Sequence, residues 1–105
     1  MKAYRLLYLA EVETDIESAC NWYRTQQAGL DRRFALAVAD AIEKLWKRPH
    51  AYAVRHKDVR IAHPRHFPFN IHFYINEKQQ IIVILAVIHG RRHGDIVKKR
   101  KPPTI

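Results

Sequence analysis

Hydrophobic residues recur at helical spacing in the first half of the chain. From residue 12 to residue 23 they fall at i, i+4, i+7, i+8 and i+11, which places them on one face of an amphipathic helix (Val12, Ile16, Ala19, Cys20 and Tyr23). The same spacing continues from residue 34 to residue 45 and predicts a second helix (Phe34, Ala37, Val38, Ala41, Ile42 and Leu45). Pro49 ends the second helix, because the residue before a proline disfavours the helical conformation.

A short connection joins the two predicted helices. The residues from Thr14 to Glu17 have the pattern of a capping box for the first helix, unless that helix begins a turn earlier. Gly29 is placed to end it as a C′ residue, and Asp31 is placed to cap the second helix. Two helices joined by so short a turn form an antiparallel hairpin.

The remaining segments have the patterns of strands. Residues 4–9 are short, apolar and rich in aromatics, and residues 59–62 form a second short candidate. Residues 67–75 alternate apolar and more polar side chains, as a strand with one buried face does. Residues 80–88 are continuously apolar, which is typical of a central strand covered on both sides. The polar turn at residues 76–79 makes the last two strands an antiparallel hairpin.

These elements predict an α+β fold in the order β-α-α-β-β-β. The helical hairpin must bury its apolar stripe on one face of a small, mainly antiparallel sheet. The other face would then stay open and carry Asn70, His72 and Tyr74, with Arg60 on the neighbouring strand. We expect one domain over residues 1–105, with a basic, mobile tail at residues 93–105.

Composition narrows the class of protein. The chain has 105 residues, of which 48% are hydrophobic, so a packed core is expected rather than disorder. No apolar run approaches the roughly 18 residues that span a bilayer, and the first residues lack the pattern of a signal peptide. A single cysteine, Cys20, excludes an internal disulfide and fits a reducing, cytoplasmic location.

The net charge of +9 is unevenly distributed. Residues 1–46 carry six Lys or Arg and seven Asp or Glu, whereas residues 47–105 carry thirteen and three. The basic character therefore belongs to the sheet half, which is typical of a protein that binds a polyanion or an acidic partner. A basic surface that serves only solubility is the alternative.

Four phrases, in order, resemble the RelE/ParE superfamily of bacterial toxins from type II toxin–antitoxin systems. They are NWYRTQQAGLDRRF at 21–34, LWKRP at 45–49, FPFNIHFYI at 67–75 and VILAVIHGRR at 83–92. The resemblance implies a growth-inhibiting toxin of a plasmid stabilisation module. It also implies an antitoxin partner that wraps the toxin, for which the basic half predicts an acidic segment.

Two mechanisms occur in this superfamily, and the fold does not decide between them. RelE-like members cleave mRNA in the ribosome, and ParE-like members act on DNA gyrase without nuclease chemistry. The third and fourth phrases look closer to ParE-like members. Between Pro49 and Ile75 the only acid is Asp58, so any nuclease site here would have to use a histidine in place of a carboxylate base. We therefore favour gyrase inhibition, with the RelE-like endonuclease and a non-toxic nucleic-acid-binding module as alternatives.

An endonuclease of this kind would work without a metal and would need a base, an acid and cations for the phosphate. His89 can exchange protons near neutral pH, and Arg suits phosphate because its planar fork binds two oxygens. The resemblance implies catalytic roles for His89, Arg60 and Arg92. Candidate residues for binding nucleic acid or the target are Arg55, Lys57, Arg60, His72, Tyr74, Arg91 and Arg92.

Other kinds of site have little support in the sequence. His63 with His66, and His89 with His93, have spacings that a metal could use, but no cysteine pair or nearby acid supports either. No phosphate-binding loop or nucleophile motif is present, so no cofactor is expected. The sequence does not predict an oligomeric state.

Overall fold

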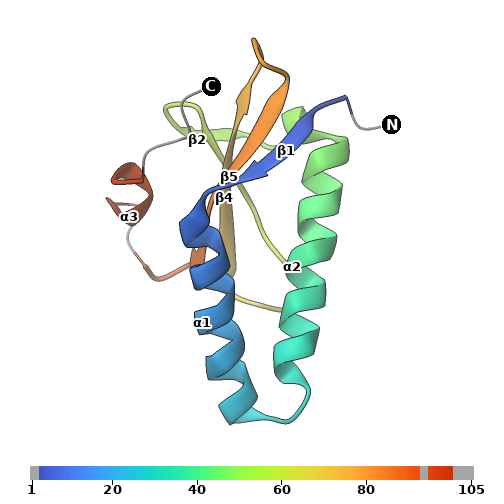
Figure 1. Ribbon diagram of the computed structural model, residues 1–105, viewed down its shortest axis with the longest axis vertical. Helices are drawn as coiled ribbons and strands as arrows, with labels where there is room; N and C mark the ends of the chain where they lie inside the picture. Colours follow the sequence, from blue (N-terminus) through green and yellow to red (C-terminus); the bar gives the residue numbers. More distant parts are fainter. Residues whose placement is uncertain (1–2, 93–94, 101–105) are drawn as a thin grey trace.

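The computed structural model describes residues 3–92 and 95–100, with Asp95 described by its backbone only. Figure 1 shows two long helices lying side by side against a sheet, with a short third helix beside α1. The elements in chain order are β1 (Arg5–Tyr8), α1 (Ala10–Gln26), α2 (Leu30–Lys47), the 3-10 turn η1 (Pro49–Ala51), β2 (Val54–His56), β3 (Val59–Ala62), β4 (Phe69–Asn76), β5 (Ile81–His89) and α3 (Asp95–Lys98).

The predicted α+β fold is confirmed. The five strands form one sheet in the order β1-β5-β4-β3-β2, in which β1 runs parallel to β5 and every other pair is antiparallel. The strand β2 and the helix α3 were not predicted, because three exposed residues and a short basic segment carry no hydrophobic period. No helix among the described residues is long and apolar enough to cross a membrane.

The helix boundaries differ from those in the sequence analysis. α1 begins at Ala10 with Leu9 as its N-cap residue, so the pattern at Thr14 lies inside the helix. α1 ends at Gln26, and Gly29 is the N-cap residue of α2 rather than the residue that ends α1. Its φ of 85° is a left-handed conformation that glycine adopts without steric cost. Asp31 lies in the first turn of α2, where a negative charge favours the helix dipole.

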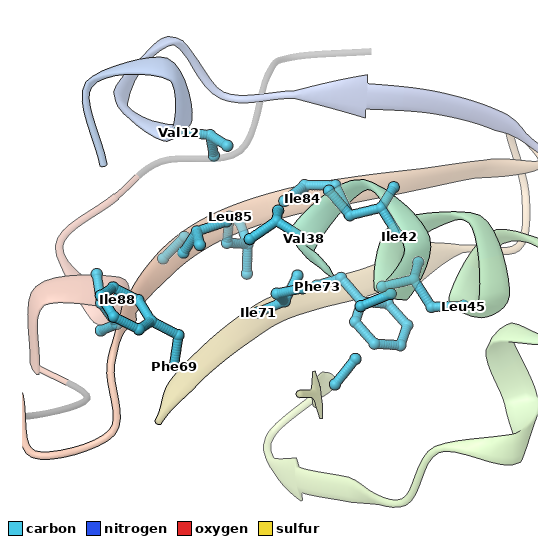
Figure 2. Close-up of a cluster of buried hydrophobic side chains, with 14 of the residues drawn as sticks. Val12, Val38, Ile42, Leu45, Phe69, Ile71, Phe73, Ile84, Leu85 and Ile88 are labelled. Atoms are coloured by element: carbon cyan, nitrogen blue, oxygen red, sulfur yellow. The ribbon is translucent and has the colours of Figure 1, made fainter. Parts of the chain in front are cut away.

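The hydrophobic core lies between the helical hairpin and the sheet. Figure 2 shows apolar side chains of α2 facing Ile71 and Phe73 of β4. An aromatic cluster lies at the other end of the hairpin, where the Phe34 ring is 4.8 Å from Phe69, 5.2 Å from Phe67 and 5.2 Å from Tyr23. This cluster ties both helices to β4, so it fixes which face of the sheet the hairpin covers.

The expected open face of the sheet is partly covered by the C-terminal segment. Val97 is buried in the core cluster, and the Arg100 guanidinium forms two hydrogen bonds to the Asp15 carboxylate, of 2.6 and 2.8 Å. Val97 and Arg100, in the segment predicted as a mobile tail over residues 93–105, pack against the sheet. An apolar side chain and a buried ion pair hold them there. Residues 93–94 and 101–105 lie outside the described part of the chain.

Candidate functional site

A hollow of about 400 Å³ lies on the sheet face opposite the helical hairpin. Its floor is built by Ile61, His72, Tyr74 and Leu85, which come from β3, β4 and β5. One side is the turn between β2 and β3, and the other is the C-terminal segment with Val97. A volume in this range suits a small ligand or one or two side chains of a partner.

His72 lies on the floor of this hollow, but it is much less accessible than predicted. Only 7% of the residue is exposed, so it cannot offer a free ring for stacking as the sequence analysis proposed. Burial lowers the pKa of His72, with smaller contributions in the same direction from Arg100 and His63 and an opposing one from Asp15. A buried neutral imidazole therefore forms part of an apolar floor.

The lowered pKa of His72 predicts a loss of stability in acid. Below about pH 6.5 the unfolded chain binds a proton that the folded chain does not, so stability falls as the pH drops toward the lowered pKa. The cost for this one group is at most about 1.4 kcal/mol per pH unit. Urea unfolding between about pH 7.5 and pH 5.5 should show a flatter pH profile for His72→Gln than for the wild type. His66→Gln, at an exposed position, should keep the wild-type profile.

Three other predicted binding residues lie around the same hollow. Arg55 and Lys57 lie on the β2–β3 side, both exposed, and Tyr74 is half-buried on β4. Lys57 has a φ of 50°, which makes the tight turn that brings β2 back alongside β3. The structure thus brings together Arg55, Lys57, His72 and Tyr74, although they are up to 19 positions apart in the sequence.

Arg60 is on the opposite face of the sheet from this hollow. It pairs with Phe73 of β4, whereas its neighbour Ile61 pairs with His72, and alternate residues of a strand point to opposite faces. The Arg60 guanidinium donates a 2.6 Å hydrogen bond to the Tyr52 carbonyl oxygen. The sequence analysis placed Arg60 near the open face, and the register of β3 on β4 corrects this.

His89 and the arginines that follow it lie at the far end of the sheet. His89 is paired with Phe69, and its Nδ1 accepts a 3.1 Å hydrogen bond from the Arg91 backbone N–H. Arg91 and Arg92 are exposed in the turn after β5. Phe69 and Phe73 are four residues apart on β4, so His89 and Arg60 are separated by roughly 13 Å along the strand direction alone.

The structure also contains groups that the sequence analysis missed. Leu85 and Val97 line the hollow, and Asp15 with Arg100 fixes the segment that carries Val97. The alternation of Val59 and Ile61 could have indicated an apolar wall, but nothing in the run 98–101 distinguishes Arg100 from its basic neighbours. No three His, Cys, Asp or Glu side chains converge on a possible metal position anywhere in the described segments.

A separate exposed cluster ties the β4–β5 turn to the N-terminal strand. Glu77 accepts hydrogen bonds of 2.7 Å from the Tyr4 hydroxyl and pairs at 2.7 Å with Nε2 of His50. The hydrogen bond from His50 lowers the pKa of Glu77, and the hydrogen bond to Glu77 raises the pKa of Tyr4. Because these two contacts are exposed and bond the three side chains to one another, we assign the cluster a structural role, which is to hold the β4–β5 turn beside the N-terminal residues.

The comparison with known families decides the class of the protein. The profile of the family described as the ParE toxin of the type II toxin–antitoxin system parDE matches residues 3–94. The chain belongs to the ParE toxin family. It is a toxin of the type II toxin–antitoxin class, and the RelE/ParE resemblance inferred from the four phrases is confirmed.

Solved structures of toxin–antitoxin complexes share the fold of this ParE-family toxin. The chromosomal ParDE system of P. aeruginosa matches with a TM-score of 0.62 and 19% identity, over 85% of this chain and 98% of that one. The RelBE2 complex of Mycobacterium tuberculosis matches with a TM-score of 0.58 and 19% identity, over 85% and 93%. The archaeal RelE–RelB complex of Pyrococcus horikoshii gives 0.51 and 17%, over 87% and 99%. No curated protein sequence matches the chain significantly.

Proposed function

We propose that this ParE-family toxin arrests growth by binding DNA gyrase, without cleaving nucleic acid, and that an antitoxin with an acidic segment neutralises it. The observation that supports a non-enzymatic action is the separation of Arg60 from the other two candidate nuclease residues, His89 and Arg92. General acid–base catalysis requires groups within hydrogen-bond reach of one reacting site, about 3 Å. His89 and Arg60 are roughly 13 Å apart along β4, and His72 and Tyr74 face the other side of the sheet.

The contacts that these residues make also support a non-enzymatic action. The Arg60 guanidinium binds a backbone carbonyl, and the His89 ring packs edge-on against Phe69 at 5.4 Å. Asp58, the acid that the sequence analysis considered, lies beside the hollow on the turn between β2 and β3. None of these groups is placed to exchange a proton with another.

The proposed function predicts that His89→Ala remains toxic. Expression of this variant should arrest growth as the wild type does, and the purified variant should inhibit gyrase supercoiling within about twofold, because the imidazole takes no part in chemistry. His66→Ala, a change at an exposed loop position, is the matched control. Both variants are compared in a supercoiling assay and in cells, where gyrase-dependent DNA breaks are counted.

A ribosome assay tests the alternative. If ribosomes programmed with a defined mRNA show cleavage by the wild type that His89→Ala abolishes, the proposal is wrong and the toxin is a RelE-like endonuclease. If the wild type binds duplex DNA in a salt-dependent way but never arrests growth, the chain is a nucleic-acid-binding module instead.

A further inference from the structure

One wall of the hollow is built by a segment outside the ParE family match. The family profile ends at residue 94, and the C-terminal segment that follows it supplies Val97, Lys98 and Arg100 to the hollow. Figure 1 shows α3 close to the first turns of α1, and Arg100, which follows α3, contacts Asp15 of α1 and the Leu85 carbonyl oxygen of β5. The shape of the hollow therefore depends on residues that the family match does not cover.

A buried ion pair holds this segment at a defect in the sheet. Between Ile84 and Ala86, strand β5 has one more residue than its partner β4, so Leu85 is the extra residue of a β-bulge. β1 pairs with β5 only as far as Ile84, and the next backbone groups along that edge need other partners. Arg100 donates a 2.9 Å hydrogen bond to the Leu85 carbonyl oxygen, and the Val87 backbone N–H donates a 3.0 Å bond to Asp15.

The pairing is strong because both charged groups are shielded from water. The side chains of Arg100 and Asp15 are 11% and 7% exposed, and the two hydrogen bonds between them form a bidentate fork. The hydrogen bond to Asp15 raises the pKa of Arg100, so the guanidinium is always charged. The wall formed by Val97 thus has a fixed position over the floor of the hollow.

The hollow has an apolar interior and a basic rim. Its interior is lined by aliphatic side chains of β3, β5 and α3, together with the neutral His72 and the Tyr74 ring (Val59, Ile61, Leu85 and Val97). Arg55 and Lys57 lie on one side of the rim and Lys98 on the other, and among the described lining residues Asp58 is the one carboxylate. Charge complementarity therefore selects an acidic occupant that also carries an apolar group.

We propose that this hollow is the docking site for one large apolar side chain on an acidic segment of the antitoxin, and that residues 96–100 determine which side chain fits. The inference rests on the proposed function, since the segment belongs to the neutralising partner. An aliphatic lining favours a leucine or phenylalanine side chain over a nucleobase, because a buried base needs hydrogen-bond partners for its polar edge. Binding of single-stranded RNA is the outcome that would reassign the site.

Short acetylated and amidated peptides of Glu and Ser with one central Leu or Phe are suitable probes. Their binding to the full-length toxin is followed by NMR, with resonances of Ile61, Leu85 and Val97 as reporters. The Leu and Phe peptides should bind about tenfold more tightly than the Ala peptide, the factor that burial of one such side chain supplies. Added salt should weaken all of them, because the rim charges are exposed.

The chain offers a matched pair of variants for this test. Val59 lines the hollow, whereas Val54 on the adjacent strand is 49% exposed and lies outside it. Val59→Glu should weaken the Leu peptide at least about tenfold, since a carboxylate in the hollow repels the acidic probe and reduces its apolar contact. Val54→Glu should leave the affinity within about twofold. Equal affinities of the two variants, or no shift of the reporter resonances with any peptide, would overturn the proposal.

Val97→Ala tests the role of the C-terminal wall. A larger hollow should shift the preference from Leu toward Phe by about threefold or more, while both peptides still bind. An unchanged preference would contradict the assignment of specificity to residues 96–100. If a short RNA shifts the same resonances and competes with the peptides, the site binds nucleic acid and the proposal is wrong.

The gyrase assay separates this inference from the proposed function. Val54→Glu, outside the hollow, should keep full inhibition of supercoiling, and Val59→Glu reports whether gyrase uses the hollow as well as the antitoxin. If Val59→Glu loses both peptide binding and gyrase inhibition, the hollow serves both partners, which supports the docking site and leaves the proposed function intact. If the wild type fails to inhibit gyrase while the peptides bind as expected, the proposed target is wrong and the docking site stands.

Discussion

Replacing Phe34 by alanine is expected to lower the free energy of unfolding by about 4 kcal/mol. Phe34 is fully buried on α2, and its ring packs against Tyr23 of α1 and against Phe67 and Phe69. Truncation removes the transfer energy of the ring and leaves a cavity that three neighbouring rings can only partly fill. The loss is large because these contacts join both helices to the sheet.

Urea unfolding measures this effect, and the same helix provides a control. Leu36 is two residues away and 70% exposed, so Leu36→Ala should change the free energy of unfolding by less than about 0.5 kcal/mol. A loss below about 2 kcal/mol for Phe34→Ala would show that the aromatic cluster is not packed as the structure describes. The supercoiling assay should then be performed only on variants that remain folded at the assay temperature.

Removing the charge of Arg100 is expected to cost about 3 kcal/mol. Arg100→Met keeps an apolar stem over the sheet but leaves the buried Asp15 carboxylate without its ion-pair partner and the Leu85 carbonyl without its donor. Breaking one side of a buried pair is costly because the remaining charge stays out of water. The exposed pair of Arg24 with Asp31 is the contrast, since Arg24→Met should cost at most about 1 kcal/mol.

A double-mutant cycle distinguishes a lost pair from general disruption. Asp15→Asn removes the buried charge, keeps an oxygen for the Val87 N–H and should offset much of the loss in the Arg100→Met background. The coupling energy between the two sites should exceed about 1 kcal/mol, measured by urea unfolding of the four proteins. Additive losses would show that residues 96–100 are not held by this pair.

The two faces of the sheet have different roles, and the stability predictions for Phe34 and Arg100 each concern one of them. One face is covered by the helical hairpin over its core residues, and Arg60 and His89, both half-buried, are paired with residues of that face. The other face keeps a hollow that is apolar inside and basic around its rim. This division of the residues between two faces supports binding of a partner better than it supports proton transfer. The wall of the hollow that Val97 forms depends on Arg100 for its stability.

Local patterns in the sequence determined most of the architecture. The helical spacing in residues 12–23 and 34–45 and the alternation in residues 67–75 each require one buried face, so they specified the two long helices, β4 and the layer order. The apolar run at 81–88 is long enough to define a central strand, and all eight of its residues are buried in β5. The four phrases around these elements were specific enough to identify the family.

Only the tertiary structure decided which polar residues share a surface. The register of β3 on β4 places Arg60 and His72 on opposite faces, and a shift of one residue would have reversed this. The buried pair of Asp15 with Arg100 joins positions 85 residues apart, and Arg100 also bonds to the bulge residue Leu85, 15 positions before it. Contacts at such distances depend on how the elements pack, and a basic run has the same local pattern whether its arginine is in solvent or buried against a carboxylate.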